Sequence, residues 1–207
     1  ATAEPTARAA PTASIIRLPL VIDNSLQCML EIATADRILD NLDLETLVII
    51  SNMAAAAMEN TQLFRWAISD PLTGLANIHY FRKTLQMELK RAERYKVPFS
   101  VAMVDLDNFK TINDTYGHAQ GDTVLTRLAT VFHEHLRMDV DLPGRYGGDE
   151  FVLLLPNTPK EGAFVVMSRI LQLFREIFFT HRTLGSFTVT LSIGIASFPE
   201  QGESSAD

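Results

Sequence analysis

The spacing of hydrophobic residues changes along the chain, and each change predicts a different element. Two short apolar runs, at 15–22 and 26–32, are separated by the polar triplet Asp23-Asn24-Ser25, a pattern typical of a β-hairpin. Further on, apolar residues recur at alternating intervals of three and four positions. This spacing predicts a long helix that is either part of a coiled coil or an amphipathic helix packed on its own domain. The recurring positions are Leu47, Ile50, Ala54, Ala57, Thr61, Phe64 and Ile68.

Helices and strands are predicted to alternate after residue 70. Residues 70–74, Asp-Pro-Leu-Thr-Gly, should end the long helix, because the residue before a proline leaves the α region and glycine favours a turn. We therefore expect a fold of the α/β (α+β) class, with a βαββαβ core whose helices cover a sheet that is antiparallel at its centre. The expected elements are a helix at 78–96, a strand from Phe99, a helix at 121–138, a hairpin around 147–150, a helix at 159–179 and a strand at 187–198.

Composition and charge narrow the range of partners. The chain has 207 residues, 47% of them hydrophobic, so most of it is expected to fold. Residues 1–14 are rich in Ala, Thr and Pro and are interpreted as a tail. The net charge of −7 disfavours nonspecific nucleic-acid binding, and the most apolar stretch, 47–58, is too short for a membrane span.

One cysteine, Cys28, excludes an internal disulfide and fits a reducing cytoplasm. Since the chain does not begin with Met, we expect it to be a piece of a longer protein.

Two acidic clusters are the candidates for chemistry. Asp105-Leu106-Asp107 ends the strand that begins at Phe99, and Asp149-Glu150 lies in the turn of the predicted hairpin. If the strand pairs beside the hairpin, both clusters reach one edge of the sheet, where carboxylates repel unless a cation compensates. Mg²⁺ binds one or two carboxylates together with substrate phosphates, so the clusters predict a nucleotide triphosphate site. The alternative is that each cluster is an ordinary turn or cap.

Phosphates would have to be held without a P-loop, because no GxxxxGK[ST] pattern occurs. The stretch 108–117, NFKTINDTYG, offers a lysine, two hydrogen-bonding side chains and backbone amides near a helix start. Amides at such a start favour anions. An EF-hand counted from Asp105 fails, because its sixth position is Lys110 instead of glycine.

Three motifs together resemble the GGDEF family of diguanylate cyclases. They are DPLTGLAN at 70–77, DLDNFKTINDTYGHAQGD at 105–122 and RYGGDEF at 145–151. The resemblance implies a nucleotidyl-cyclase or palm-like fold and the condensation of two GTP molecules into cyclic di-GMP. It also gives Gly147 and Gly148 a function in the hairpin, since residues without a Cβ let the backbone approach the nucleotide closely.

The resemblance assigns the metal and catalytic positions. It implies that Asp105, Asp149 and the carbonyl of Leu106 are ligands of Mg²⁺, for which Mn²⁺ could substitute. Asp149 and Glu150 are the implied catalytic residues, with Asp149 accepting the proton of the 3′-hydroxyl. This fits a two-metal scheme that activates the attacking oxygen and stabilises the leaving pyrophosphate.

Substrate positions follow from the same resemblance. Asn113 and Asp122 match the guanine-binding positions, where a carboxylate accepts hydrogens that adenine lacks. Lys110 and the backbone amides of Asn108 and Phe109 match the phosphate contacts. The ordinary alternatives are that Asn113 caps a helix and that Asp122 is a surface acid.

The chain departs from the family pattern at two places. Many members carry a product-inhibition site, Arg-x-x-Asp, separated by five residues from GGDEF. Asp141 fits this pattern, but Met138 stands in place of the arginine, so we expect the site to be absent. Arg137 is one position out of register, which on a helix would turn it about 100° away. The family also continues past Asp207 with a helix and a basic segment that contacts phosphates, so the activity of this stretch alone is left open.

The start of the chain resembles the end of a GAF sensory domain. We therefore expect three parts: the tail at 1–14, a partial GAF-like segment and stalk helix at 15–69, and a GGDEF domain at 70–207 that lacks its end. The stalk would act as an N-terminal signalling helix and pair two copies into a homodimer, since joining two nucleotides requires two sites face to face. The functional hypothesis is a Mg²⁺-dependent diguanylate cyclase of the bacterial cytoplasm under sensor control. The alternative is a non-catalytic GTP-binding or dimerisation module.

Overall fold

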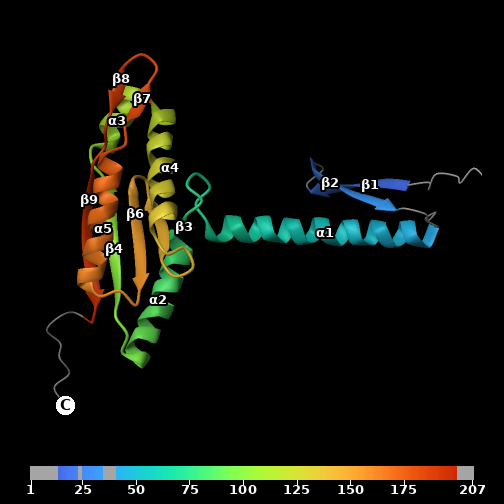
Figure 1. Cartoon of the computed structure of the whole chain (residues 1–207), viewed down its shortest axis with the longest axis horizontal. Helices are drawn as coiled ribbons and strands as arrows, with labels where there is room; N and C mark the ends of the chain where they lie inside the picture. The colour runs from blue at the N-terminus through green and yellow to red at the C-terminus, as the bar shows by residue number, and fades with distance from the viewer. Residues whose placement is uncertain (1–13, 23–24, 35–40, 200–207) are drawn as a thin grey trace, which may run out of the picture. The chain divides into compact units, whose positions relative to one another are not determined.

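The computed structural model describes residues 14–22, 25–34 and 41–199 (Figure 1). The chain divides into two compact units, residues 1–65 and 66–207, close to the boundary expected at residue 70. The elements of the first unit are β1 (Ser14–Ile22), β2 (Ser25–Thr34) and most of α1 (Asn41–Ile68). Those that follow are β3 (Ala76–Asn77), α2 (Ile78–Tyr95), β4 (Phe99–Leu106), α3 (Phe109–Tyr116), α4 (His118–His135), β5 (Leu142–Gly147), β6 (Glu150–Pro156), α5 (Lys160–Arg175), β7 (Phe179–His181), β8 (Gly185–Phe187) and β9 (Leu191–Phe198).

The first unit is a hairpin with one long helix. β1 and β2 pair antiparallel, as predicted, and the Oγ of Ser51 in α1 donates a hydrogen bond of 3.3 Å to the carbonyl of Pro19 in β1. Of the predicted tail, only Ser14 is described, and it begins β1; residues 1–13 and the predicted turn residues 23–24 lie outside the described residues. α1 is one helix of 28 residues, and its pairing as a coiled coil stays a prediction. None of the helices described has the length and apolar character that crossing a bilayer requires.

The second unit is built on a five-stranded sheet in the order β3-β5-β6-β4-β9. β6 is the middle strand, its neighbour β4 pairs antiparallel with both β6 and β9, and the short edge strand β3 runs parallel to β5. The connections β4-α3-α4-β5-β6-α5-β9 give the predicted βαββαβ core, antiparallel at its centre.

Alternating side chains of the sheet pack into two hydrophobic cores, one on each face. Val104, Leu106, Phe151 and Leu153 face α4 and α5, where the larger core also includes Leu128, Phe132, Ile170 and Phe174. Val152, Leu154 and Phe99 face α2, which contributes Phe81 and Ala92. In Figure 1, α5 is drawn beside β9 and β4, α4 on the other side of β6, and α2 beside the lower end of the sheet. This alternation means that every second side chain of β4 and β6 points to the α2 face.

Three predicted elements have different bounds in the structure. The helix expected at 121–138 begins at His118, directly after a separate short helix α3, and ends at His135. The helix expected at 159–179 ends at Arg175. The strand expected at 187–198 is interrupted at 188–190, because Phe187 belongs to β8 and pairs with β7, whereas the pairing with β4 begins at Leu191 in β9. The ring of Phe187 stacks on that of Tyr116 in α3, with 4.0 Å between the ring centroids.

Candidate active site

The two acidic clusters meet at one end of the sheet. Asp105 near the end of β4 lies directly opposite Glu150 at the start of β6, and Asp149 precedes Glu150 in the two-residue turn after Gly147. Opposed residues of an antiparallel pair have Cβ atoms about 5 Å apart on the same face. Burial raises the pKa of Asp105, and the charges of Asp149, Glu150 and Asp107 raise it further. The concentration of negative charge here therefore lowers the stability of the folded protein.

These donors fit a divalent cation whose coordination a ligand completes. Asp105 and Asp149 supply carboxylate oxygens, the ligand type preferred by a hard cation. Leu106 packs in the core and its side chain has no polar atom, so only its backbone carbonyl could serve at this site. Within the described residues no three His, Cys, Asp or Glu side chains are arranged to enclose a metal. Two carboxylates suit a divalent cation that keeps waters and shares phosphate oxygens.

The predicted guanine-binding residues lie on α3 and α4, which pack closely where Asn113 of α3 contacts Gly121 of α4. Asn113 is half-buried inside α3 and Asp122 is exposed in α4, so Asn113 is not a helix cap; the residue that precedes α3 is Asn108. A Cβ on Gly121 would collide with the Asn113 amide and lie 3.2 Å from the ring of Phe109. Gly121 thus leaves the space that Asn113 occupies, beside the backbone of Asp122. The binding roles themselves stay predictions.

The predicted phosphate contacts surround the start of α3. Asn108 has a φ of 59°, in the left-handed region that asparagine tolerates better than most residues, and its side chain does not cap the helix. Lys110, the second residue of α3, is exposed, while the ring of Phe109 packs against the core. The first amides of a helix have no partner within it, so they can bind an anion here.

The turn that carries Asp149 is tied to the start of the domain. Arg145 donates through Nε and Nη2 to the carbonyl of Gly148, at 3.0 and 2.7 Å, and through Nη1 to both oxygens of Asp70, at 3.2 and 3.3 Å. Asp70 also accepts from the backbone N–H and hydroxyl of Thr73, at 2.8 and 2.7 Å. Burial raises the pKa of Asp70, but the Thr73 hydrogen bonds and Arg145 outweigh it, and the pKa falls below its usual value.

The sequence interpretation did not assign this link. Gly148 has a φ of +54°, so a residue with a side chain would be strained in the turn, whereas Gly147 has open space around its missing Cβ and no positive φ. A signal for the link existed in Asp70-Pro-Leu-Thr73, which is typical of a side-chain-capped turn. Its partner 75 positions away could not be recognised from local spacing.

The candidate product-inhibition residues have a structural function. Met138 is exposed, and Asp141 is 5% exposed and bound by Arg137, whose Nη2 and Nε lie 2.6 and 3.0 Å from its oxygens. The helical register assumed for Arg137 does not apply, because α4 ends at His135, and Arg137 pairs with Asp141. Arg137 also donates to the carbonyl of Pro156 and the hydroxyl of Thr158. The Asp141 carboxylate is therefore already bound within the protein.

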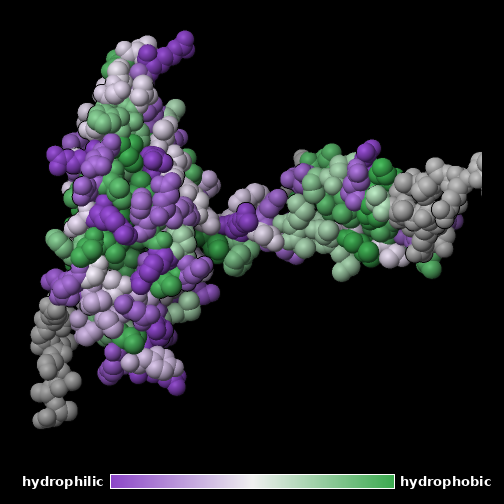
Figure 2. Space-filling model, viewed as in Figure 1, coloured by the Kyte–Doolittle hydropathy of each residue, from purple (hydrophilic) through white to green (hydrophobic). Residues whose placement is uncertain are grey.

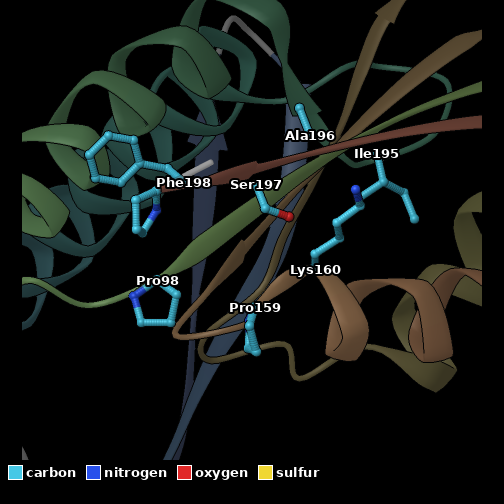
Figure 3. Close-up of a pocket in the computed structure, with 8 residues that line it drawn as sticks. Pro98, Pro159, Lys160, Ile195, Ala196, Ser197 and Phe198 are labelled. Atoms are coloured by element: carbon cyan, nitrogen blue, oxygen red, sulfur yellow. The ribbon is translucent and has the colours of Figure 1, made fainter. Parts of the chain in front are cut away.

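A pocket of about 510 Å³ lies away from these residues. It surrounds the end of β9 that pairs with Phe99, whereas Asp105 pairs near the other end. Figure 3 shows the residues that line it: Pro98, Pro159, Lys160, Ile195, Ala196, Ser197, Phe198 and Pro199. It contains none of the predicted site residues and forms no part of the candidate site.

The fold and the paired acidic segments define a nucleotidyl-cyclase-like domain, and the comparisons give its family. Residues 67–207 match the family described as diguanylate cyclase, GGDEF domain. Diguanylate cyclase A of Treponema denticola is 39% identical over 155 residues, which are 72% of this chain and 40% of that protein. Response regulator PleD of Caulobacter vibrioides is 38% identical over 138 residues, 66% of this chain and 30% of that protein. The chain belongs to the GGDEF-domain family of diguanylate cyclases, and it spans less than half the length of these relatives.

Solved structures confirm the predicted fold class. The coiled coil and GGDEF domain of DgcB from Caulobacter crescentus, in complex with c-di-GMP, has a TM-score of 0.67 and 25% identity, covering 76% of this chain and 83% of that one. Diguanylate cyclase SiaD of Pseudomonas aeruginosa, in complex with its activator SiaC, has a TM-score of 0.61 and 38% identity, covering 74% of this chain and 59% of that one. The GAF-like character of residues 15–69 stays a prediction.

Proposed function

We propose that this chain contains the cyclase domain of a bacterial diguanylate cyclase, which joins two GTP molecules into cyclic di-GMP and releases two pyrophosphates. The observation that carries the proposal is the pairing of Asp105 with Glu150, which brings Asp149 and the carbonyl of Leu106 to one end of the sheet. Family membership supports the same reaction. As a user of GTP, the protein would work in the cytoplasm.

Each half of the reaction is one displacement at phosphorus. The 3′-oxygen of one GTP bonds to the α-phosphorus of the other, the bond from that phosphorus to the bridging oxygen breaks, and pyrophosphate leaves. Asp149 is the proposed acceptor of the 3′-hydroxyl proton, because its half-buried carboxylate lies in the hairpin turn next to Glu150, which pairs with Asp105. Asp105 and the Leu106 carbonyl would hold Mg²⁺, which when bound stabilises negative charge on the attacking and leaving oxygens.

Base selection is assigned to the junction of α3 and α4. Asp122 would accept the N1 and N2 hydrogens of guanine, and the Asn113 amide, held beside it by the space at Gly121, would bind the same ring. Adenine lacks these hydrogens and would leave the Asp122 carboxylate without donors. GTP should therefore be used in preference to ATP.

Two copies are needed, because one domain holds one GTP and each GTP attacks the other. α1 is the proposed contact between copies, since its exposed apolar side chains include Ile50 at 47%, Phe64 at 61% and Trp66 at 67% exposure. Figure 2 shows hydrophobic colouring over much of this helix. The solved part of DgcB consists of a coiled coil and a GGDEF domain, which supports the same arrangement here. A sensor preceding α1 would set the distance between the two sites.

Product analysis with a matched pair of variants tests the proposal. The full-length protein incubated with GTP and Mg²⁺ should yield cyclic di-GMP, identified by mass spectrometry, and Asp149→Ala should reduce the rate by at least about a hundredfold. Asp139→Ala is the control, since it removes the same charge from an exposed position outside the site. GTP binding without product would instead identify a non-catalytic module, and an active Asp149→Ala protein would refute the role of Asp149.

A further inference from the structure

Asp105 and Asp107 lie two positions apart but have different surroundings. Both carboxylate oxygens of Asp107 accept hydrogen bonds: Oδ2 from the hydroxyl of Thr190 at 2.5 Å and Oδ1 from that of Ser192 at 2.6 Å. The Asp105 carboxylate, by contrast, has no hydrogen-bond partner among the residues that the structure describes. We call Asp107, Thr190 and Ser192 the Asp107 clamp.

The strand register makes this division of partners informative. Ser192 of β9 lies directly opposite Asp105, just as Glu150 of β6 does on the other side, so the three side chains share one face of the sheet. A serine hydroxyl opposite a carboxylate could donate to it and occupy a lone pair. Here the Ser192 hydroxyl donates to Asp107 instead. The oxygens of Asp105 therefore stay available to a cation.

The backbone of the clamp also orients the carbonyl next to Asp105. The N–H of Asp107 donates to the carbonyl of Thr190 at 3.0 Å. Because a trans peptide is planar, its C=O points opposite to its N–H, so the Leu106 carbonyl is directed away from β9, toward the side of β4 on which β6 lies. This is the side that carries Glu150 and the Asp149 turn. The hydroxyl bonds of the clamp hold the same peptide in place.

We propose that Asp107 is a positioning residue, whose bonds to Thr190 and Ser192 keep the Asp105 carboxylate free and the Leu106 carbonyl aligned for a divalent cation. The inference rests on the proposed function, because it concerns the cation of that site. It adds to the site two hydroxyl residues, Thr190 just before β9 and Ser192 on β9, that contribute no ligand of their own. Loss of such supporting hydrogen bonds typically weakens metal binding by about 10- to 100-fold.

Binding of Mn²⁺ alone, without nucleotide, tests the clamp directly. Free Mn²⁺ is measured by electron paramagnetic resonance in a titration of the full-length protein. The double variant Thr190→Val/Ser192→Ala removes both hydroxyls and leaves every charge in place, and we expect its affinity to fall about tenfold. The variant Thr190→Ser/Ser192→Thr retains both hydroxyls and should bind within about twofold of the unaltered protein. Thr188→Val/Ser168→Ala is the control, because both positions are exposed and have no side-chain hydrogen bond within the described part of the chain.

The outcomes separate the clamp from the proposed function. The clamp is overturned if the unaltered protein does not bind Mn²⁺, if the hydroxyl-free variant binds as well, or if the control loses as much affinity. Should the hydroxyl-free variant fail to fold, as judged by thermal unfolding, Ser192→Ala alone replaces it, with an expected loss of about threefold. Cyclic di-GMP formation is measured separately. If the variants show the expected differences in Mn²⁺ affinity but the unaltered protein forms no cyclic di-GMP, the proposed cyclase activity is refuted and the clamp is supported. If cyclic di-GMP forms but the hydroxyl-free variant binds Mn²⁺ as tightly as the unaltered protein, the clamp alone is refuted.

Discussion

Replacement of Asp70 by asparagine should show how strongly the turn that carries Asp149 is tied to the start of the domain. Asparagine keeps an oxygen that can accept the Thr73 N–H, so Asp70→Asn removes mainly the charge that faces Arg145. Arg145 would then keep its bonds to Gly148 but lose its only ion pair among the described residues. The loss of stability in Asp70→Asn therefore measures the Asp70–Arg145 interaction, because asparagine and aspartate side chains have nearly the same shape.

The expected magnitude follows from the exposure of the pair. The Arg145 and Asp70 side chains are 16% and 17% exposed. Fully exposed pairs contribute about 0–1 kcal/mol, and loss of one partner of a buried pair costs about 3–5 kcal/mol. An intermediate pair should contribute about 2 kcal/mol, which corresponds to a fall in melting temperature of about 7 °C for a unit of this size.

The pH dependence has a defined sign. Because the pKa of Asp70 is lowered in the folded protein, its stabilising effect is complete above the ordinary aspartate pKa and is lost as the pH falls through the lowered value. The difference in unfolding free energy between the unaltered protein and Asp70→Asn should therefore be constant near neutral pH and shrink in acid.

Urea unfolding followed by circular dichroism gives the free energies for a double-mutant cycle. The cycle combines Asp70→Asn with Arg145→Gln and should return a coupling energy of about 1–2 kcal/mol. Asp139→Asn, at an exposed position, is the control and should change stability by less than about 0.5 kcal/mol. A coupling energy near zero, or a loss that persists unchanged in acid, would refute the reasoning.

Three further changes test other parts of the site. Asp105→Asn should raise the free energy of unfolding of the metal-free protein by about 0.5 kcal/mol at pH 7, because it removes one of two opposed like charges. Since the pKa of Asp105 is raised in the folded protein, this gain should grow with rising pH, and a lower free energy of unfolding in urea would contradict the prediction. Gly121→Ala should weaken GTP binding in calorimetry at least about tenfold by displacing Asn113, and unchanged affinity would refute the packing argument. Met138→Arg should not create tight binding of cyclic di-GMP, because Asp141 is already bound; a dissociation constant below about 1 μM would disprove this.

Local sequence was enough to predict most of the fold. The mainly apolar segment from Phe99 and the turn at 147–150 predicted a strand and a hairpin, and both are present. Side-chain periodicity and turn residues act over a few positions, so such elements can be recognised without tertiary information. The short helix α3 was missed because only Gly117, with a φ of 86°, separates it from α4.

The arrangement of the site depended on distant parts of the chain. The amino-acid sequence determined which acids, amides and glycines were available, through motifs whose residue types suit Mg²⁺, phosphate and guanine. Only the tertiary structure decided that Asp105 faces Glu150, that Arg145 joins Gly148 to Asp70, and that Asp107 is bound by the hydroxyls of Thr190 and Ser192. The physical reason is that strand register and long-range hydrogen bonds are set by packing of the whole sheet, which no local spacing encodes.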